Sequence, residues 1–263
     1  MPKVFANNIN INYEVQGITS NQVVMFSNSL ASNLTMWDLQ VEKLIENDLC
    51  VVRYDSRGHG KSDCPPGPYT IEMLSDDAAA LIDQLDIGPI HFCGLSKGGM
   101  VAQMMGARHP EKIKTLTIAD SAAYMPAKET WEQRIIAVQQ GGMKAIVDGT
   151  LERWITGPGQ KRLPDQVDLI REMILNTNPI GFMACSEAIK SMDLRLANLS
   201  IQRPTIVICG EQDTGTTPEQ AAEIANSIPS AKLELISNAA HLANIEQPEI
   251  FNTLLVDHIK AHH

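Results

Sequence analysis

The chain has 263 residues, of which 44% are hydrophobic and 20% are charged. This composition excludes a largely disordered chain and is sufficient for one large domain with room for an inserted subdomain. The formal net charge of −10 argues against nucleic acid and anionic membrane surfaces as partners, and an acidic substrate would need a local cation to attract it.

Short apolar runs typical of β-strands recur along the chain, and helix-type segments separate them. The first run, "NININYEVQG" (8–17), predicts a hairpin at the edge of a sheet. Further runs follow at 23–26, 49–54, 90–94, 115–120, 205–210 and 232–236, and helical patterns cover 75–85, 100–108, 218–228 and 248–258. Several runs are apolar throughout, as expected for parallel strands covered on both faces. The alternation predicts an α/β fold with a mostly parallel, doubly wound sheet.

The interval from 123 to 200 breaks this alternation, because its pattern is helical and contains no convincing strand. We interpret it as a helical cap inserted between two strands of the sheet. The Gly- and Pro-rich "TGPGQKRLP" (156–164) is expected to be a loop inside the cap. The predicted organisation is therefore an α/β core of residues 1–122 and 201–263 with a cap at 123–200.

The cysteines and the N-terminal segment indicate in which cellular compartment the protein is expected. The five cysteines have no C-x-x-C spacing and fit reduced thiols better than a disulfide framework or a zinc site; they are Cys50, Cys64, Cys93, Cys185 and Cys209. The start "MPKVFANNIN" lacks the basic and apolar parts of a signal peptide, and no apolar run has the length of a membrane span. We expect a cytoplasmic protein without membrane or metal partners.

A serine stands among glycines directly after the apolar run at 90–94. Residues 94–98, Gly-Leu-Ser-Lys-Gly, match G-x-S-x-G, with a strand before the motif and a helix after it. A nucleophile on a strained strand-to-helix turn needs small neighbours, because larger side chains would collide with the tight backbone. The helix N-terminus also favours developing negative charge. Ser96 is therefore the predicted nucleophile.

A serine nucleophile needs a base and a group that orients the base. Asp213 follows one buried strand and His241 follows the last strand, which gives the order Ser, acid, His that this architecture requires. Both lie at carboxyl ends of strands, where α/β sheets gather their chemistry. Asp213 as a turn-forming residue, Asp120 as a rival acid and His241 as a surface-loop histidine remain alternatives.

An oxyanion needs hydrogen-bond donors that are already in place. One predicted donor is the backbone N–H of Lys97, the residue after the nucleophile. The second is expected from the loop after the strand at 23–26, and we assign it to Ser29, with Leu30 as the alternative. His59 in "DSRGHG" is expected to shape a loop.

These motifs resemble the α/β-hydrolase fold over nearly the whole chain, and within it the 3-oxoadipate enol-lactonases of bacterial aromatic-compound degradation. The more specific similarities are "SNSL" followed by "MWDLQV", "ETWEQR" in the cap and "AAHLANIEQPE" around the histidine. Two residues depart from the family pattern. Lys97 replaces an apolar residue that is usually Met, and Ala31 stands where Gly is frequent.

The resemblance implies lactone ring opening through an acyl-enzyme, in the β-ketoadipate pathway and without a metal or organic cofactor. The expected partner is a small lactone or ester, and a homo-oligomer is compatible with the sequence. Alternatives on the same fold are a carboxylesterase, a lactonase for other rings, a C–C hydrolase and a cofactor-free haloperoxidase. A small-molecule receptor is the non-enzymatic alternative.

A cation is needed if the substrate carries a free carboxylate. Lys97 could supply it, or its long side chain could lean away so that the ammonium reaches solvent. Arg134 in the cap segment "ETWEQR" is the other candidate, with Trp131 as an apolar wall. A solvated arginine on a cap helix is the alternative for Arg134.

Overall fold

The sheet has eight strands, and the computed structural model describes residues 2–18, 22–229 and 231–262. The strands run in the order β1-β2-β4-β3-β5-β6-β7-β8. β2 is antiparallel to both of its neighbours, and the other pairs are parallel. The predicted α/β class and the later strands are confirmed. A hairpin does stand at the edge of the sheet, but residues 8–17 supply only its second strand, and the first strand, at 3–6, was not predicted. The strands are Lys3–Ala6 (β1), Ile9–Gln16 (β2), Gln22–Ser27 (β3), Leu49–Tyr54 (β4), Ile90–Leu95 (β5), Ile113–Ala119 (β6), Thr205–Gly210 (β7) and Lys232–Ile236 (β8).

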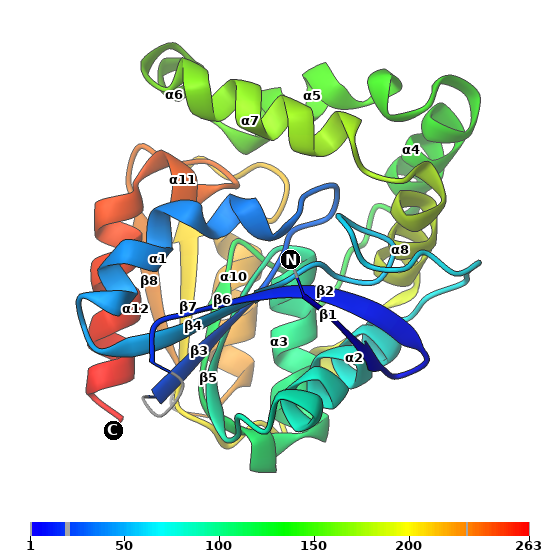
Figure 1. The fold of residues 1–263 in the computed structure, drawn as a ribbon. Coiled ribbons are helices and arrows are strands. Elements are labelled where there is room, and N and C mark those ends of the chain that lie inside the picture. The colour runs from blue at the N-terminus through cyan, green and yellow to red at the C-terminus, as the bar shows by residue number, and fades with distance from the viewer. Residues whose placement is uncertain (1, 19–21, 230, 263) are drawn as a thin grey trace.

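Helices cover both faces of this sheet (Figure 1). On one face lie α1 (Asp38–Ile45) and α12 (Pro248–Lys260), and on the other α2 (Ile71–Leu85), α3 (Lys97–Arg108) and α10 (Pro218–Ser227). The central strands β4, β5 and β7 are buried at every position, as their continuous apolar runs predict. The sequence pattern missed α1, which has eight residues and no side-chain hydrogen bond at its N-cap.

The segment between β6 and β7 is helical, as predicted, and it lies over one end of the sheet (Figure 1). We call the segment 128–198 the cap; nothing in the fold tests the predicted division at 123 and 200, which stays a prediction. The helices are α4 (Lys128–Gly141), α5 (Val147–Trp154), α6 (Gly157–Arg162), α7 (Pro164–Leu175), α8 (Pro179–Ser191) and α9 (Arg195–Asn198).

The prediction of a loop at 156–164 is wrong. Helix α6 occupies most of this stretch, and α7 begins at Pro164. The Thr156 side chain caps α6 by accepting a hydrogen bond of 3.0 Å from the Gly159 N–H. Prolines in the first turn of a helix lose no hydrogen bond, so here Pro158 and Pro164 begin helices instead of breaking them.

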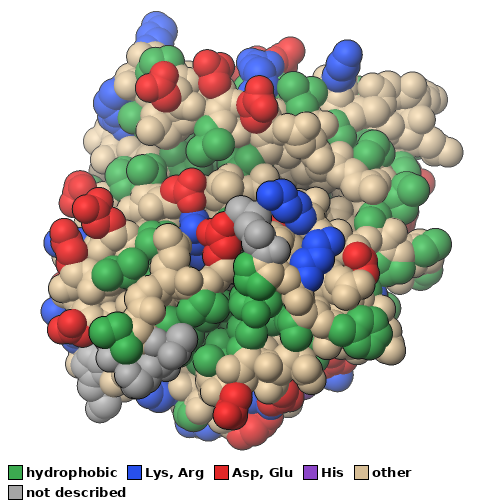
Figure 2. Space-filling model, in the orientation of Figure 1, with side chains coloured by type: hydrophobic (Ala, Val, Ile, Leu, Met, Phe, Trp, Pro, Cys, Tyr) green, Lys and Arg blue, Asp and Glu red, His purple; other side chains and the backbone are tan. Residues whose placement is uncertain are grey.

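On the face seen in Figure 2, acidic and basic side chains are interspersed with hydrophobic ones, so this face has no large patch of a single charge. In the part of the chain that the structure describes, no helix combines the length and the apolar character that crossing a membrane requires.

Candidate active site

Ser96 occupies the turn between β5 and α3, as the sequence predicts. Its backbone has φ +57° and ψ −115°, a strained conformation for a non-glycine residue. The turn is tight: a Cβ at Gly94 would lie 1.9 Å from the Gly98 carbonyl oxygen, and a Cβ at Gly98 would lie 2.0 Å from the Ser27 carbonyl oxygen. The small residues around Ser96 are therefore required by the close approach of three backbone segments.

His241 and Asp213 form a hydrogen-bonded pair beside Ser96. His241 Nδ1–H donates to Asp213 Oδ2 over 2.7 Å. The other Asp213 oxygen accepts hydrogen bonds from the Gly215 and Thr216 N–H groups, and the Thr216 hydroxyl donates to Oδ2 over 2.8 Å. Burial alone would raise the pKa of Asp213, but His241 and these donors outweigh it and lower the pKa. The carboxylate is thus held ionised, and His241 Nε2 remains to act as a base.

Asp120, the rival acid, lies close to this pair without hydrogen-bonding to His241. Its Oδ1 accepts from the Gly210 N–H over 2.8 Å, while its Oδ2 has no hydrogen-bond partner in the described part of the chain. Burial, followed by repulsion from Asp213, raises the pKa of Asp120 well above its usual range. Of the two carboxyl groups, Asp213 is the one that hydrogen-bonds to His241 Nδ1, so the geometry favours Asp213 as the acid.

The loop after β3 is held by buried polar side chains. Asn28 donates to the Tyr54 carbonyl oxygen over 2.8 Å and accepts from the Trp37 indole N–H over 3.0 Å. His59 Nε2 accepts from the Ala31 N–H over 3.1 Å, so the expectation that His59 shapes a loop is confirmed. Sequence reasoning did not assign these roles to Asn28 and Trp37, although the "SNSL…MWDLQV" pattern contains both residues.

The donors for an oxyanion differ in their availability. The Lys97 N–H is at the first position of α3, where no intrahelical acceptor exists. The Ser29 N–H donates to Met36 Sδ over 3.3 Å, whereas no described acceptor takes the Leu30 N–H. Sulfur is a weak acceptor that an oxyanion can replace. Both loop donors therefore stay candidates, and Leu30, the predicted alternative, is the one already unengaged.

The expectation that the Lys97 ammonium reaches solvent is wrong. The side chain has 0% exposure, and Nζ has no hydrogen-bond partner within the described ranges. It is also absent from the lining of the cavity at Ser96. The buried ammonium lies close enough to His59, Cys185 and Asp55 to interact with them electrostatically, and burial lowers the pKa of Lys97. The Lys97 side chain is therefore not placed to contact a substrate.

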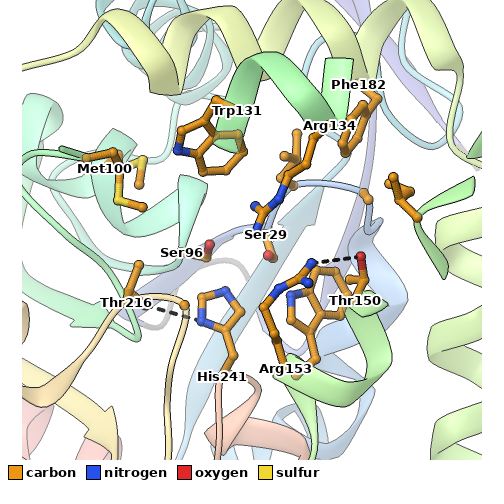
Figure 3. Close-up of a pocket in the computed structure, with 16 residues that line it drawn as sticks. Ser29, Ser96, Met100, Trp131, Arg134, Thr150, Arg153, Phe182, Thr216 and His241 are labelled. Carbon is orange, nitrogen blue, oxygen red and sulfur yellow. Dashed lines mark hydrogen bonds between the residues drawn. The ribbon is translucent and has the colours of Figure 1, made fainter. Parts of the chain in front are cut away.

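A cavity joins the Ser96–His241 pair to the cap (Figure 3). Arg134 lines it, with its guanidinium carbon 4.6 Å from the Trp131 ring centroid. Arg134 is half-buried, so it is not a fully solvated cap arginine, and its role toward a substrate stays a prediction. Burial and repulsion from Arg153 lower its pKa to about 10. The predicted Trp131 wall is present, and further lining side chains come from Met100, Thr150, Trp154, Phe182 and Thr216.

Arg153 also lines this cavity, and sequence reasoning missed it. It lies in the last turn of α5, in the cap segment "LERWI". That segment pairs an arginine with a tryptophan, as "WEQR" does in α4. The repeated pairing was the available signal.

Comparisons with known proteins agree with this geometry. A family model described as the alpha/beta hydrolase fold matches residues 22–248. The 3-oxoadipate enol-lactonase 2 of Acinetobacter baylyi is 33% identical over 247 residues, which cover 94% of this chain and 92% of the relative. The 3-oxoadipate enol-lactonase 1 of the same organism is 31% identical over 251 residues, covering 95% and 93%.

Among solved structures, the enol-lactonase from Burkholderia xenovorans LB400 superimposes with a TM-score of 0.96 at 36% identity, covering 98% of this chain and 100% of the other. The chain belongs to the α/β-hydrolase fold superfamily and, within it, to the 3-oxoadipate enol-lactonase family of hydrolases.

Proposed function

We propose that the protein is a serine hydrolase that opens 3-oxoadipate enol-lactone, or a lactone of the same kind, to the free acid. The observation that carries this proposal is a cavity in which Ser96 and His241, the latter hydrogen-bonded to Asp213, face the half-buried Arg134. Among the described residues, Arg134 has no carboxylate partner. The assembled acid–base pair favours an enzyme over a receptor. The cationic wall favours an acid-bearing lactone over a neutral ester.

Ser96 is the nucleophile in this mechanism. His241 Nε2 takes the proton from Ser96 Oγ as that oxygen attacks the lactone carbonyl, and Asp213 fixes the histidine tautomer. The N–H groups of Lys97 and of Ser29 or Leu30 stabilise the oxyanion. The ring C–O bond then breaks, and His241 returns the proton to the departing enol oxygen.

Hydrolysis of the acyl-enzyme completes the cycle. The enol tautomerises to the ketone, which removes it as a competing nucleophile. Water attacks the acyl carbonyl and gives a proton to His241, and the proton then returns to Ser96 Oγ as the Ser–acyl bond breaks. The products are the free acid and unchanged enzyme, and no step requires a cofactor.

Arg134 is the proposed ligand for the carboxylate that the substrate carries outside its ring. A guanidinium in a partly desolvated cavity pairs with a carboxylate through charge-assisted hydrogen bonds. The Trp131 ring, which packs against the Arg134 guanidinium, would restrict this side chain to the cavity and offer an apolar wall to the lactone ring.

The test compares the acid lactone with its neutral methyl ester in the wild type, Arg134→Ala and Lys97→Met. Arg134→Ala should lower kcat/KM for the acid selectively, by about 10-fold or more, since a lost charged hydrogen bond is worth 1.4 kcal/mol or more. Lys97→Met should change both substrates equally because its side chain lies outside the cavity. Equal losses on acid and ester in Arg134→Ala would contradict carboxylate recognition by Arg134.

A further inference from the structure

The cavity contains a second arginine that the reaction as described does not use. Arg153 projects from the last turn of α5, and its Nη2 donates to the Thr150 hydroxyl over 3.2 Å. In Figure 3, Arg134 extends into the cavity from above and Arg153 from below. Both line the same space as Ser96 and His241.

Among the described residues, neither guanidinium has a counter-charge at ion-pair distance. Across residues 2–18, 22–229 and 231–262, no carboxylate oxygen lies within 4.0 Å of a side-chain nitrogen of Arg134 or Arg153. Burial lowers the pKa of both groups, and Arg153 lowers that of Arg134 further by repulsion. Two like charges in a shared, partly desolvated cavity are unfavourable unless a ligand supplies negative charge.

The two arginines belong to different sides of the cavity. Arg134 packs on Trp131 in α4. Arg153 precedes Trp154, whose ring centroid is 6.0 Å from that of His241 and whose carbonyl oxygen accepts a hydrogen bond of 3.0 Å from the Leu242 N–H. Arg153 is therefore next to a residue that contacts the histidine loop, where the acyl group would be hydrolysed. Arg134 lies on the α4 side of the cavity.

We propose that Arg153 forms a second anion subsite, separate from that of Arg134, which binds the carboxylate released from Ser96. The inference rests on the proposed function, because hydrolysis of an acyl-enzyme creates one carboxylate. A substrate that already carries one carboxylate leaves as a dicarboxylate, whose two charges match the two arginines. The dicarboxylate product should therefore bind more tightly than a monoacid.

The test uses inert ligands so that binding is measured without turnover. Adipate is compared with adipic acid monoamide, in which a neutral amide of the same shape replaces one carboxylate. Isothermal titration calorimetry gives both Kd values for the wild type, Arg153→Met, Arg153→Lys and Arg171→Met. Arg171 is a cap arginine outside the cavity, paired with Asp148 at the surface, and it controls for the loss of one positive charge.

The wild type and Arg171→Met should prefer adipate over the monoamide by about 10-fold or more, as expected for one additional charge-assisted ion pair. Arg153→Met should lose this preference, and Arg153→Lys should keep part of it because the cation remains. Equal weakening of both ligands by Arg153→Met, or a wild type without preference, would overturn the proposal. Thermal unfolding shows whether each variant has folded. If Arg153→Met has not folded, the ligand preference of Arg153→Lys tests the proposal in its place.

The same ligands separate this inference from the proposed function. The preference should persist in Ser96→Ala, which binds without hydrolysing. If the wild type prefers adipate but opens no lactone, the proposed hydrolase function is refuted, while the anion subsite at Arg153 is still supported. An active hydrolase without the preference would refute the subsite alone.

Discussion

The buried ammonium of Lys97 is expected to lower the free energy of unfolding. Its ammonium is fully buried and has no hydrogen-bond partner in the described structure, a costly state for a charge. Methionine has a similar length and no charge, so Lys97→Met should raise the free energy of unfolding by roughly 1–4 kcal/mol. Urea unfolding at pH 7 measures this, and Lys144→Met, at an exposed cap position, is the control. A destabilised Lys97→Met would show that the ammonium has a stabilising partner.

The same residue predicts a pH dependence with a definite sign. Burial lowers the pKa of Lys97 below its usual 10.5, so the unfolded chain binds this proton more tightly than the folded one. Stability therefore rises with pH between the folded and the unfolded pKa. The advantage of Lys97→Met over the wild type should be full below the folded pKa and should vanish as the pH approaches 10.5. Unfolding curves at pH 7 and pH 10 check this, and an unchanged difference would contradict it.

The acid of the triad can be identified by a pair of substitutions. Asp213→Asn should lower kcat by about 10,000-fold, because the histidine then adopts the wrong tautomer. Asp120→Asn should leave far more activity, because His241 hydrogen-bonds to Asp213 and not to Asp120, whose Oδ1 accepts from the Gly210 N–H. Steady-state hydrolysis of an activated ester measures both, and the reverse ranking would place the acid after β6.

At the scale of elements, one buried carboxylate connects the cap to the histidine loop. Glu246 accepts hydrogen bonds from the Ala240 N–H over 3.0 Å, from the Thr156 N–H over 3.2 Å and from the Thr156 hydroxyl. Sequence reasoning gave Glu246 no role, although "AAHLANIEQPE" contains it.

Removing this carboxylate should loosen the start of α6. Glu246→Ala leaves the N–H groups of the buried Ala240 and the half-buried Thr156 without this acceptor. It should lower the free energy of unfolding by roughly 1–3 kcal/mol for the buried donor and by less for the half-buried one. Hydrogen exchange should show the protection of α6 falling more than that of β5, and Glu223→Ala at an exposed site should change neither. Uniform loss of protection across the sheet would mean that Glu246 does not act as a local anchor.

Most elements could be predicted because their signals are local. Apolar runs reveal β4, β5 and β7, since strands covered on both faces need apolar residues throughout. The error at 156–164 arose because glycine and proline were read as loop formers, whereas the Thr156 cap and first-turn prolines make the same residues begin α6 and α7. That outcome depends on the position of each proline within a turn.

At the scale of the whole molecule, the site combines residues that the chain order predicts with residues that only packing reveals. Ser96, Asp213 and His241 could be proposed because each follows a strand, and parallel strands end at one edge of the sheet. The path of the Lys97 side chain and the approach of Arg153 depend on how the cap packs on the core. No local pattern encodes that arrangement, so these two features had to come from the structure.

The hydrolysis of 3-oxoadipate enol-lactone by the purified wild type and Ser96→Ala tests the central claim most directly. The account predicts multiple turnovers by the wild type and a loss of roughly three or more orders of magnitude in Ser96→Ala, as for other triads, with unchanged thermal unfolding. Ser96→Ala that folds normally and retains wild-type activity on this lactone would contradict the account.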